Sequence, residues 1–220
     1  MAISKRLLEI AKYIKGYETL ADIACDHGYL GIYAAINFNL KEVLLTDINE
    51  MPLASAKENV AKRELNSVIK TKLGDGLAPL DKDYDVITIA GIGGVLLVQI
   101  LENDLDKAKR AKRLVLCSNT DTDLVRKYLV ENGFMIEREE MIHDYKYYEI
   151  IVAKYIGQVV NYTDLEIKYG PVLLKEKSKE FCEYYERQLK LYSGQVDKIN
   201  DLVSKERLQT KISEINKILE

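Results

Sequence analysis

Short apolar runs and helical patterns alternate along the first 155 residues of the chain. The apolar runs have the length and continuity of buried strands and cover residues 20–24, 42–47, 68–73, 86–90 and 114–118. Apolar residues at helical spacing lie between them, over residues 3–14, 30–37, 52–64, 95–102 and 121–132. Residues 135–143 and 147–155 alternate between apolar and polar positions, which predicts a closing antiparallel pair. The whole pattern predicts an α/β fold with a doubly wound, mostly parallel sheet.

The pattern changes after residue 155. Residues 161–170 read as a linker or a short helix, and from Pro171 onward apolar residues recur every three or four positions without a strand signal. A break near Ser193 and Gly194, or near Ser204, would fold this tract into a helical hairpin, and the spacing alone does not choose between them. We therefore expect two domains, residues 1–155 and residues 156–220.

Composition narrows the class of protein. A hydrophobic fraction of 47% and a charged fraction of 30% are typical of globular proteins. No apolar run approaches ~20 residues, and the first residues are amphipathic, so we expect neither a membrane span nor a secretory signal. The three cysteines show no C-x-x-C spacing, which argues against bound metal and disulfides and favours the cytoplasm. A net charge of −3 argues against nucleic-acid binding over the whole surface but allows one basic face.

Acidic and glycine residues stand where the predicted parallel strands end. They are Asp22 and the turn 26–29 at the first strand, Asp47 at the second, Asp75 after the third and the turn 91–94 after the fourth. Carboxyl ends of parallel strands meet at one edge of a sheet, so these residues are expected to form one site. Each also has a structural reading, as a turn, a helix terminus or a buried histidine, and only the ordered set favours a cofactor site.

The turn after the first strand indicates the kind of cofactor. It lacks the dinucleotide fingerprint G-x-G-x-x-G, because only Gly28 and Gly31 are present, and it carries two carboxylates, Asp22 and Asp26. Carboxylates repel a pyrophosphate but attract a ligand that carries an ammonium and a sulfonium group. S-adenosyl-L-methionine fits this description, and NAD does not.

Longer motifs extend this interpretation to a family. They are Asp22-Ile-Ala-Cys-Asp-His-Gly-Tyr-Leu, Asp47-Ile-Asn-Glu-Met-Pro-Leu-Ala-Ser-Ala, Leu73-Gly-Asp-Gly-Leu and Ile89-Ala-Gly-Ile-Gly-Gly. With them the chain closely resembles the bacterial TrmK family, S-adenosylmethionine-dependent tRNA methyltransferases that act on N1 of the adenine at tRNA position 22. The resemblance continues into the tail at residues 169–177. Ala24 departs from it, since the family usually has glycine there, as do Gly31 in place of proline and Cys117-Ser-Asn in place of Gln-Pro-Asn.

The resemblance implies a Rossmann-like class I methyltransferase domain followed by a coiled-coil hairpin that helps to bind tRNA. It also implies roles for individual residues around the cofactor. These are Asp22, His27, Gly28 and Tyr29 around the methionine part; Asp47 and Ile48 at the ribose; Gly74, Asp75 and Gly76 at the adenine; and Ala90 and Gly91 beside the sulfonium.

Adenine N1 carries an in-plane lone pair, so direct displacement needs orientation and charge handling more than a strong base. Asp26 and His27 are the candidates for favouring the positive charge that develops on the base, and Asn119 is the candidate for a hydrogen bond to the base edge. The Asn-Pro-Pro-Tyr type of motif used for exocyclic nitrogens is absent, which favours a ring nitrogen. The target lies inside tRNA structure, so extrusion of the base is implied.

Basic side chains are the candidates for phosphate contacts, although a run of charges can equally be a solvated face. They are Lys5 and Arg6 on the first helix, Lys109, Arg110 and Arg113 in the densest basic cluster, and Lys175 and Lys177 in the tail.

The favoured function is therefore a tRNA adenine-N1 methyltransferase, which we expect to be a monomer. Two alternatives remain from the sequence: a methyltransferase of small molecules with a helical lid, and a non-catalytic tRNA-binding protein of the same fold.

Overall fold

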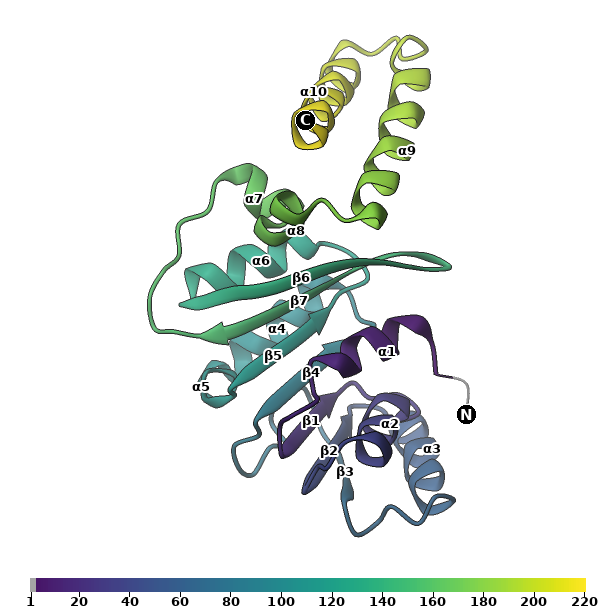
Figure 1. Ribbon diagram of the computed structural model, residues 1–220, viewed down its shortest axis with the longest axis vertical. Coiled ribbons are helices and arrows are strands. Elements are labelled where there is room, and N and C mark those ends of the chain that lie inside the picture. Colours follow the sequence, from purple (N-terminus) through teal and green to yellow (C-terminus); the bar gives the residue numbers. More distant parts are fainter. Residues whose placement is uncertain (1–2) are drawn as a thin grey trace.

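The computed structural model describes residues 3–220 and contains one seven-stranded sheet (Figure 1). The strands are β1 (Thr19–Ile23), β2 (Glu42–Asp47), β3 (Ile69–Leu73), β4 (Val86–Ala90), β5 (Arg113–Cys117), β6 (Phe134–Asp144) and β7 (Lys146–Tyr155). Their order is β3-β2-β1-β4-β5-β7-β6. The first five run parallel, whereas β7 is antiparallel to both β5 and β6. The predicted sheet and its closing antiparallel pair are confirmed.

Helices cover both faces of the sheet, because successive strand residues point to opposite sides. In β1, Leu20 packs with the helices α1 (Lys5–Lys12), α2 (Tyr29–Asn37) and α3 (Glu50–Ala61). Its neighbour Ala21 belongs to a second core with α4 (Gly94–Asn103), α5 (Leu105–Arg110) and α6 (Thr122–Glu131). Both faces of the parallel strands are therefore buried, which explains their continuous apolar sequences.

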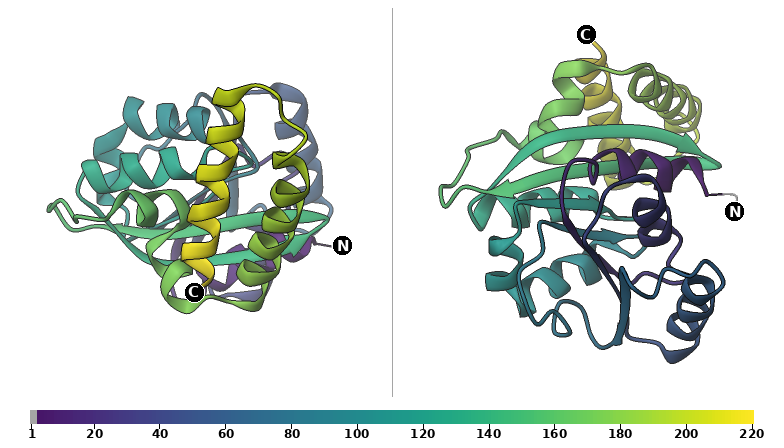
Figure 2. Two further views of the ribbon diagram at one scale, coloured as in Figure 1. Left: turned by 90° about the horizontal axis from the view of Figure 1, so that it is seen from above. Right: turned by 60° about the horizontal axis from the view of Figure 1, so that its bottom comes forward.

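Four further helices follow β7: α7 (Asp164–Tyr169), α8 (Pro171–Glu176), α9 (Lys179–Val196) and α10 (Leu202–Leu219). The short helices α7 and α8 contact α6 and β6, and α9 and α10 lie side by side as a hairpin (Figure 2). A third apolar cluster, which includes Phe181, Tyr185 and Ile215, holds this part together. None of the helices in residues 3–220 has the combined length and apolar character needed to cross a bilayer.

The hairpin turns at residues 197–201, which lie between the two breaks considered from the sequence. Gly194 lies inside α9, so this glycine does not end the helix. No atom lies within 4 Å of the position that a Cβ would take there. Ser204 lies inside α10, and its backbone N–H is capped by the carboxylate of Asp201 at 2.8 Å. A further break, not expected from the pattern, separates α8 from α9 at Lys177, whose φ of 44° is left-handed. The predicted coiled-coil supercoiling and the domain boundary at residue 155 stay predictions.

A buried ionic cluster joins α7 and α8 to the sheet. Arg126 of α6 is fully buried, its Nε donates to Glu139 Oε1 of β6 at 2.6 Å, and its guanidinium also pairs with Glu149 of β7. The guanidinium donates further to the carbonyl oxygens of Ile167 and Lys168, at 3.4 and 3.3 Å. Glu139 Oε2 accepts hydrogen bonds from the first N–H groups of α8. The cluster thus supplies hydrogen-bond partners to the backbone carbonyls at the end of α7 and to the backbone N–H groups at the start of α8.

We expect Arg126→Met to lower the free energy of unfolding by about 3–5 kcal/mol, because it leaves Glu139 and Glu149 without their counter-charge. Urea denaturation measures the change. Lys127→Met, at the exposed neighbouring position of α6, is the matched control and should change the stability by less than about 0.5 kcal/mol. Equal stabilities of the two variants would contradict the role given to the cluster.

Candidate functional site

A cavity of about 420 Å³ lies at the carboxyl ends of β1 and β4. These strands are neighbours in the sheet, but the chain continues from β1 toward β2 and from β4 toward β5, in opposite directions. Crevices of this kind, at the carboxyl ends of parallel strands, are the usual ligand sites of α/β sheets. The cavity brings together most of the predicted cofactor residues from the ends of β2, β3 and β4: Asp47, Ile48, Gly74, Asp75, Gly76, Ala90 and Gly91. Asp26, predicted to be catalytic, and Arg6, predicted to contact tRNA, also line it.

The turn after β1 forms one wall and is locally strained. Ala24 and Asp26 have φ values of 54° and 51°, a left-handed conformation that costs roughly 1 kcal/mol or more for a residue with a Cβ. The turn is held by two hydrogen bonds to β2: Cys25 N–H to the Thr46 carbonyl at 2.9 Å, and Asp26 N–H to Asp47 Oδ2 at 3.1 Å. Glycine, which the resemblance implies at this position for the family, would adopt the left-handed conformation without this cost.

Asp47 is the fixed acid of the cavity. Only 7% of its surface is exposed, and its second oxygen, Oδ1, accepts the Asn49 N–H at 2.9 Å. Beside it, Thr46 Oγ1 is buried without a hydrogen-bond partner among the described residues, although Thr46 lines the cavity. A buried hydroxyl without a partner is costly unless a ligand or water satisfies it. The sequence analysis missed Thr46; its only signal is a polar residue within the apolar run of β2.

Asp22 and Gly28 do not line the cavity. Asp22 is buried in β1, where it accepts a hydrogen bond from Thr88 Oγ1 at 2.7 Å, and burial raises its pKa to about 6. Gly28 packs against β2, since a Cβ there would lie 2.7 Å from Leu45 Cδ1. Both residues thus pack against the neighbouring strands, and their predicted contact with the cofactor stays a prediction.

His27 and Tyr29 are also absent from the cavity wall. His27 Nδ1 lies 2.7 Å from Ser55 Oγ of α3, and its backbone carbonyl accepts a hydrogen bond from Asn59. The ring centres of His27 and Tyr29 lie 5.5 Å apart, and Asp26 Oδ1 is 3.6 Å from His27 Nε2. The imidazole therefore contacts α3 on one side and the exposed Asp26 on the other, at the rim of the site.

The loops after β4 and β5 are joined to each other by hydrogen bonds beside the cavity. Asn119 Nδ2 donates to the carbonyl oxygen of Gly91 at 2.5 Å, and the Asn119 N–H donates to the Ile92 carbonyl at 2.7 Å. Gly91 has a φ of 92°, and the guanidinium nitrogens of Arg6 lie 3.5 Å from the position where its Cβ would be. Asn119 thus contacts Gly91, a residue predicted to flank the sulfonium, and its hydrogen bond to the base edge stays a prediction.

A family model described as "TrmK: tRNA (adenine(22)-N(1))-methyltransferase" matches residues 20–220. The chain belongs to this family. Its resemblance to TrmK, inferred from the motifs, is confirmed, and with it the activity of a tRNA adenine-N1 methyltransferase.

Sequence and structural similarity to known proteins extends over nearly the whole length of the chain. The tRNA (adenine(22)-N(1))-methyltransferase of Bacillus subtilis is 33% identical over 221 residues, which cover 98% of this chain and 93% of the relative. A Streptococcus pneumoniae structure described as a tRNA (m1A22) methyltransferase shares 32% identity and superposes with a TM-score of 0.93, with full coverage of both chains. The same protein in complex with S-adenosyl-L-methionine gives a TM-score of 0.90, again at 32% identity and full coverage. The Rossmann-like fold is confirmed.

The basic residues predicted to bind tRNA fall in two separate regions of the chain. Arg6 lines the cavity, and Lys5 lines a separate pocket together with Glu176 and Ser178. Glu176 is the last residue of α8, which also carries Lys175 and is followed by Lys177. The dense basic cluster lies at the amino ends of the strands, on the side where Figure 1 shows α5. There Arg110 pairs with Asp83, Arg113 with Glu137, and Lys109 lies 5.2 Å from the Tyr155 ring. This cluster is not brought together with the cavity.

The raised pKa of Asp22 predicts a pH dependence of stability. Its folded-state pKa of about 6 exceeds the ordinary value of 3.8 for an aspartate, so the neutral carboxyl is favoured by folding and this stabilisation is lost as the pH rises through 6. Relative to Asp22→Asn, the wild type should lose on the order of 2–3 kcal/mol between pH 4 and pH 7. Denaturant titrations of both proteins at several pH values measure this difference.

Thr88→Val serves as the second variant. It removes the hydrogen bond that favours the ionised carboxylate, so the loss should continue to higher pH than in the wild type. A difference between wild type and Asp22→Asn that does not change with pH would contradict the assignment.

Proposed function

We propose that this chain transfers the methyl group of S-adenosyl-L-methionine directly to N1 of adenine 22 of tRNA, at the point where Asn119 meets the Gly91 carbonyl. The observation that carries the proposal is the cavity at the β1–β4 crevice, lined by residues from the ends of β2, β3 and β4. We also propose that the protein works as a monomer in the cytoplasm.

The residues of the cavity fit this cofactor. S-adenosyl-L-methionine supplies a methyl group on a positively charged sulfur. Asp47, a fixed acceptor, would hold the ribose hydroxyls, and the partnerless Thr46 hydroxyl beside it can meet a further polar group. Gly74, Asp75 and Gly76 would surround the adenine of the cofactor, and Ala90 and Gly91 would flank the sulfonium.

The protein's part in the reaction is orientation and charge handling. The side-chain amide of Asn119 donates to the Gly91 carbonyl and the backbone N–H of Asn119 donates to the Ile92 carbonyl, so the side chain is held in place and can position an acceptor base without reorganising. The exposed carboxylate of Asp26, on the cavity wall, and the adjacent imidazole of His27 would favour the positive charge on the methylated base.

Arg6 is the cationic side chain of the cavity wall, and we infer that it binds the carboxylate of the cofactor's methionine. Its guanidinium forms no ion pair with an acid among the described residues. A guanidinium carries the charge opposite to that of a carboxylate, and its planar geometry suits two parallel hydrogen bonds to the carboxylate oxygens. A tRNA phosphate, the role expected from the sequence, has the same charge and is the alternative anion.

Arg6→Gln should weaken S-adenosylmethionine binding about tenfold or more in calorimetry, the effect of losing a hydrogen bond between charged groups. Binding of decarboxylated S-adenosylmethionine, which lacks the carboxylate, should be equal in wild type and variant. Unchanged cofactor binding with a raised KM for tRNA would instead assign Arg6 to a phosphate. Lys5→Ala, one residue away on the same helix, is the matched control for cofactor binding.

The reaction itself is tested with unmodified bacterial tRNA, labelled S-adenosylmethionine and nucleoside analysis by mass spectrometry. We expect 1-methyladenosine as the labelled product, and its loss when position 22 carries another base. Labelled 2-methyladenosine or a methylated guanosine as the only product would reject the proposed function.

Lys5, which precedes the cavity residue Arg6, and Lys175 of α8 should contribute more to tRNA binding than the basic residues of α5. Lys5→Ala and Lys175→Ala should each raise the KM for tRNA and reduce the slope of its salt dependence by about 1, the effect of one lost phosphate contact. Lys109→Ala and Arg110→Ala are matched changes at the amino edge and should leave both quantities unchanged. The reverse pattern would place the tRNA on the α5 side.

A further inference from the structure

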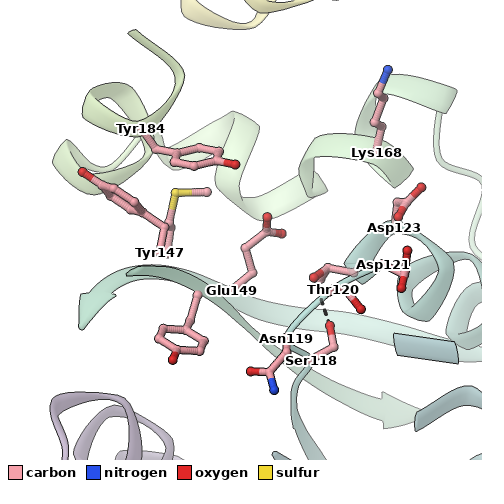
Figure 3. Close-up of a pocket in the computed structure, with 12 residues that line it drawn as sticks. Ser118, Asn119, Thr120, Asp121, Asp123, Tyr147, Glu149, Lys168 and Tyr184 are labelled. Atoms are coloured by element: carbon pink, nitrogen blue, oxygen red, sulfur yellow. Dashed lines mark hydrogen bonds between the residues drawn. The ribbon is translucent and has the colours of Figure 1, made fainter. Parts of the chain in front are cut away.

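The structure contains a second cavity, of about 230 Å³, whose lining residues are drawn in Figure 3. It lies between the segment that follows β5, the β6–β7 hairpin and the helices α7 and α9. Asn119 lines it and donates to the Gly91 carbonyl of the first cavity. Arg6 of the first cavity lies 4.9 Å from the ring centre of Tyr148, which lines the second. Residues that line the second cavity therefore contact residues that line the first, at the end predicted to hold the sulfonium.

The lining of this second cavity does not suit a phosphate. Asp121, Asp123 and Glu149 contribute carboxylates, and the single lysine, Lys168, pairs with Glu214 at 2.5 Å. Figure 3 shows the Lys168 amino group pointing away from Glu149. An acidic cavity repels an anion but stabilises a base that gains positive charge when it is alkylated.

Glu149 is held in place by an ion pair beneath the cavity. One of its oxygens pairs with the fully buried Arg126, and Figure 3 shows its carboxylate near the middle of the lining residues. The guanidinium fixes the carboxylate in place, so it is an oriented hydrogen-bond acceptor. The exocyclic amino group of adenine is a donor, whereas guanine has an acceptor at the same position of its ring.

One side of the cavity is aromatic. The rings of Tyr147 and Tyr184 lie 4.9 Å apart, and Figure 3 shows them together at one end of the lining. Tyrosine rings are common stacking partners of bases that have left a helix. Tyr184 belongs to α9, so the helical hairpin forms part of this wall.

We propose that the second cavity receives the adenine extruded from tRNA, that Glu149 accepts a hydrogen bond from its exocyclic amino group, and that Tyr184 of the hairpin packs against its ring. The proposal rests on the proposed function and adds the residues that select adenine. The helical hairpin then completes the acceptor site, in addition to any contact it makes with the tRNA backbone.

The test compares two tRNAs, one with adenosine and one with purine riboside at position 22. Purine riboside keeps N1 but lacks the amino group. We expect wild type to methylate it with a kcat/KM about 10- to 100-fold lower, the effect of one lost hydrogen bond to a charged acceptor. In Glu149→Gln, methylation of the adenosine tRNA should fall by a similar factor, and discrimination between the two tRNAs should shrink to a few fold. S-adenosylmethionine binding, measured by calorimetry, should be unchanged.

Tyr184 provides an independent readout that does not disturb the ion pair. Tyr184→Ala should lower kcat about 10-fold, as expected for a lost base-stacking contact, with little change in the KM for tRNA. Tyr184→Phe keeps the ring and should retain activity, and Leu191→Ala, an exposed position of α9 outside the cavity, is the matched control.

Wild-type discrimination below twofold, a Glu149→Gln variant that discriminates like wild type, or a fully active Tyr184→Ala variant would overturn the inference. In each case, formation of 1-methyladenosine by the wild type would leave the proposed function standing. Failure of the wild type to form 1-methyladenosine would reject the proposed function and this inference together.

Discussion

The site depends on one topological constraint, the reversal of winding between β1 and β4. The chain leaves β1 toward β2 and β3 and later returns through β4 toward β5, so the loops after these two neighbouring strands diverge. Divergence leaves a crevice that side chains of neither loop fill. Asp47, Asp75 and Gly91 are far apart in sequence, yet each follows or ends a parallel strand and therefore reaches the same crevice.

The buried Arg126 connects this sheet to the rest of the molecule. Isolated buried charges are costly, and an apolar replacement of a whole ionic cluster is often as stable as the cluster. Arg126 does two things that an apolar side chain cannot do: it binds backbone carbonyls of α7, and it fixes the carboxylate of Glu149 beside the second cavity. The same cluster thus attaches the helices that precede the hairpin and orients an acid next to the site.

The sequence predicted the features that depend on local pattern, and missed those that depend on side-chain direction or distant contacts. Apolar runs located all five parallel strands, and their ends located most of the cavity. Sequence pattern did not predict that His27 contacts Ser55 of α3, which depends on the left-handed Ala24 and Asp26 of the turn after β1, and its expected place beside the cofactor stays a prediction. Arg6 and Arg126 act through partners more than ten residues away, which no periodicity encodes.

The central claim is that the strand ends at the β1–β4 crevice together hold the cofactor. A crystal structure of this chain with bound S-adenosyl-L-methionine tests it most directly. We expect the ribose hydroxyls within hydrogen-bond distance of the Asp47 carboxylate and the methyl group directed toward Gly91 and Asn119. Density for the ligand on the α5 side of the sheet, or a methyl group directed away from Asn119, would contradict the site as described.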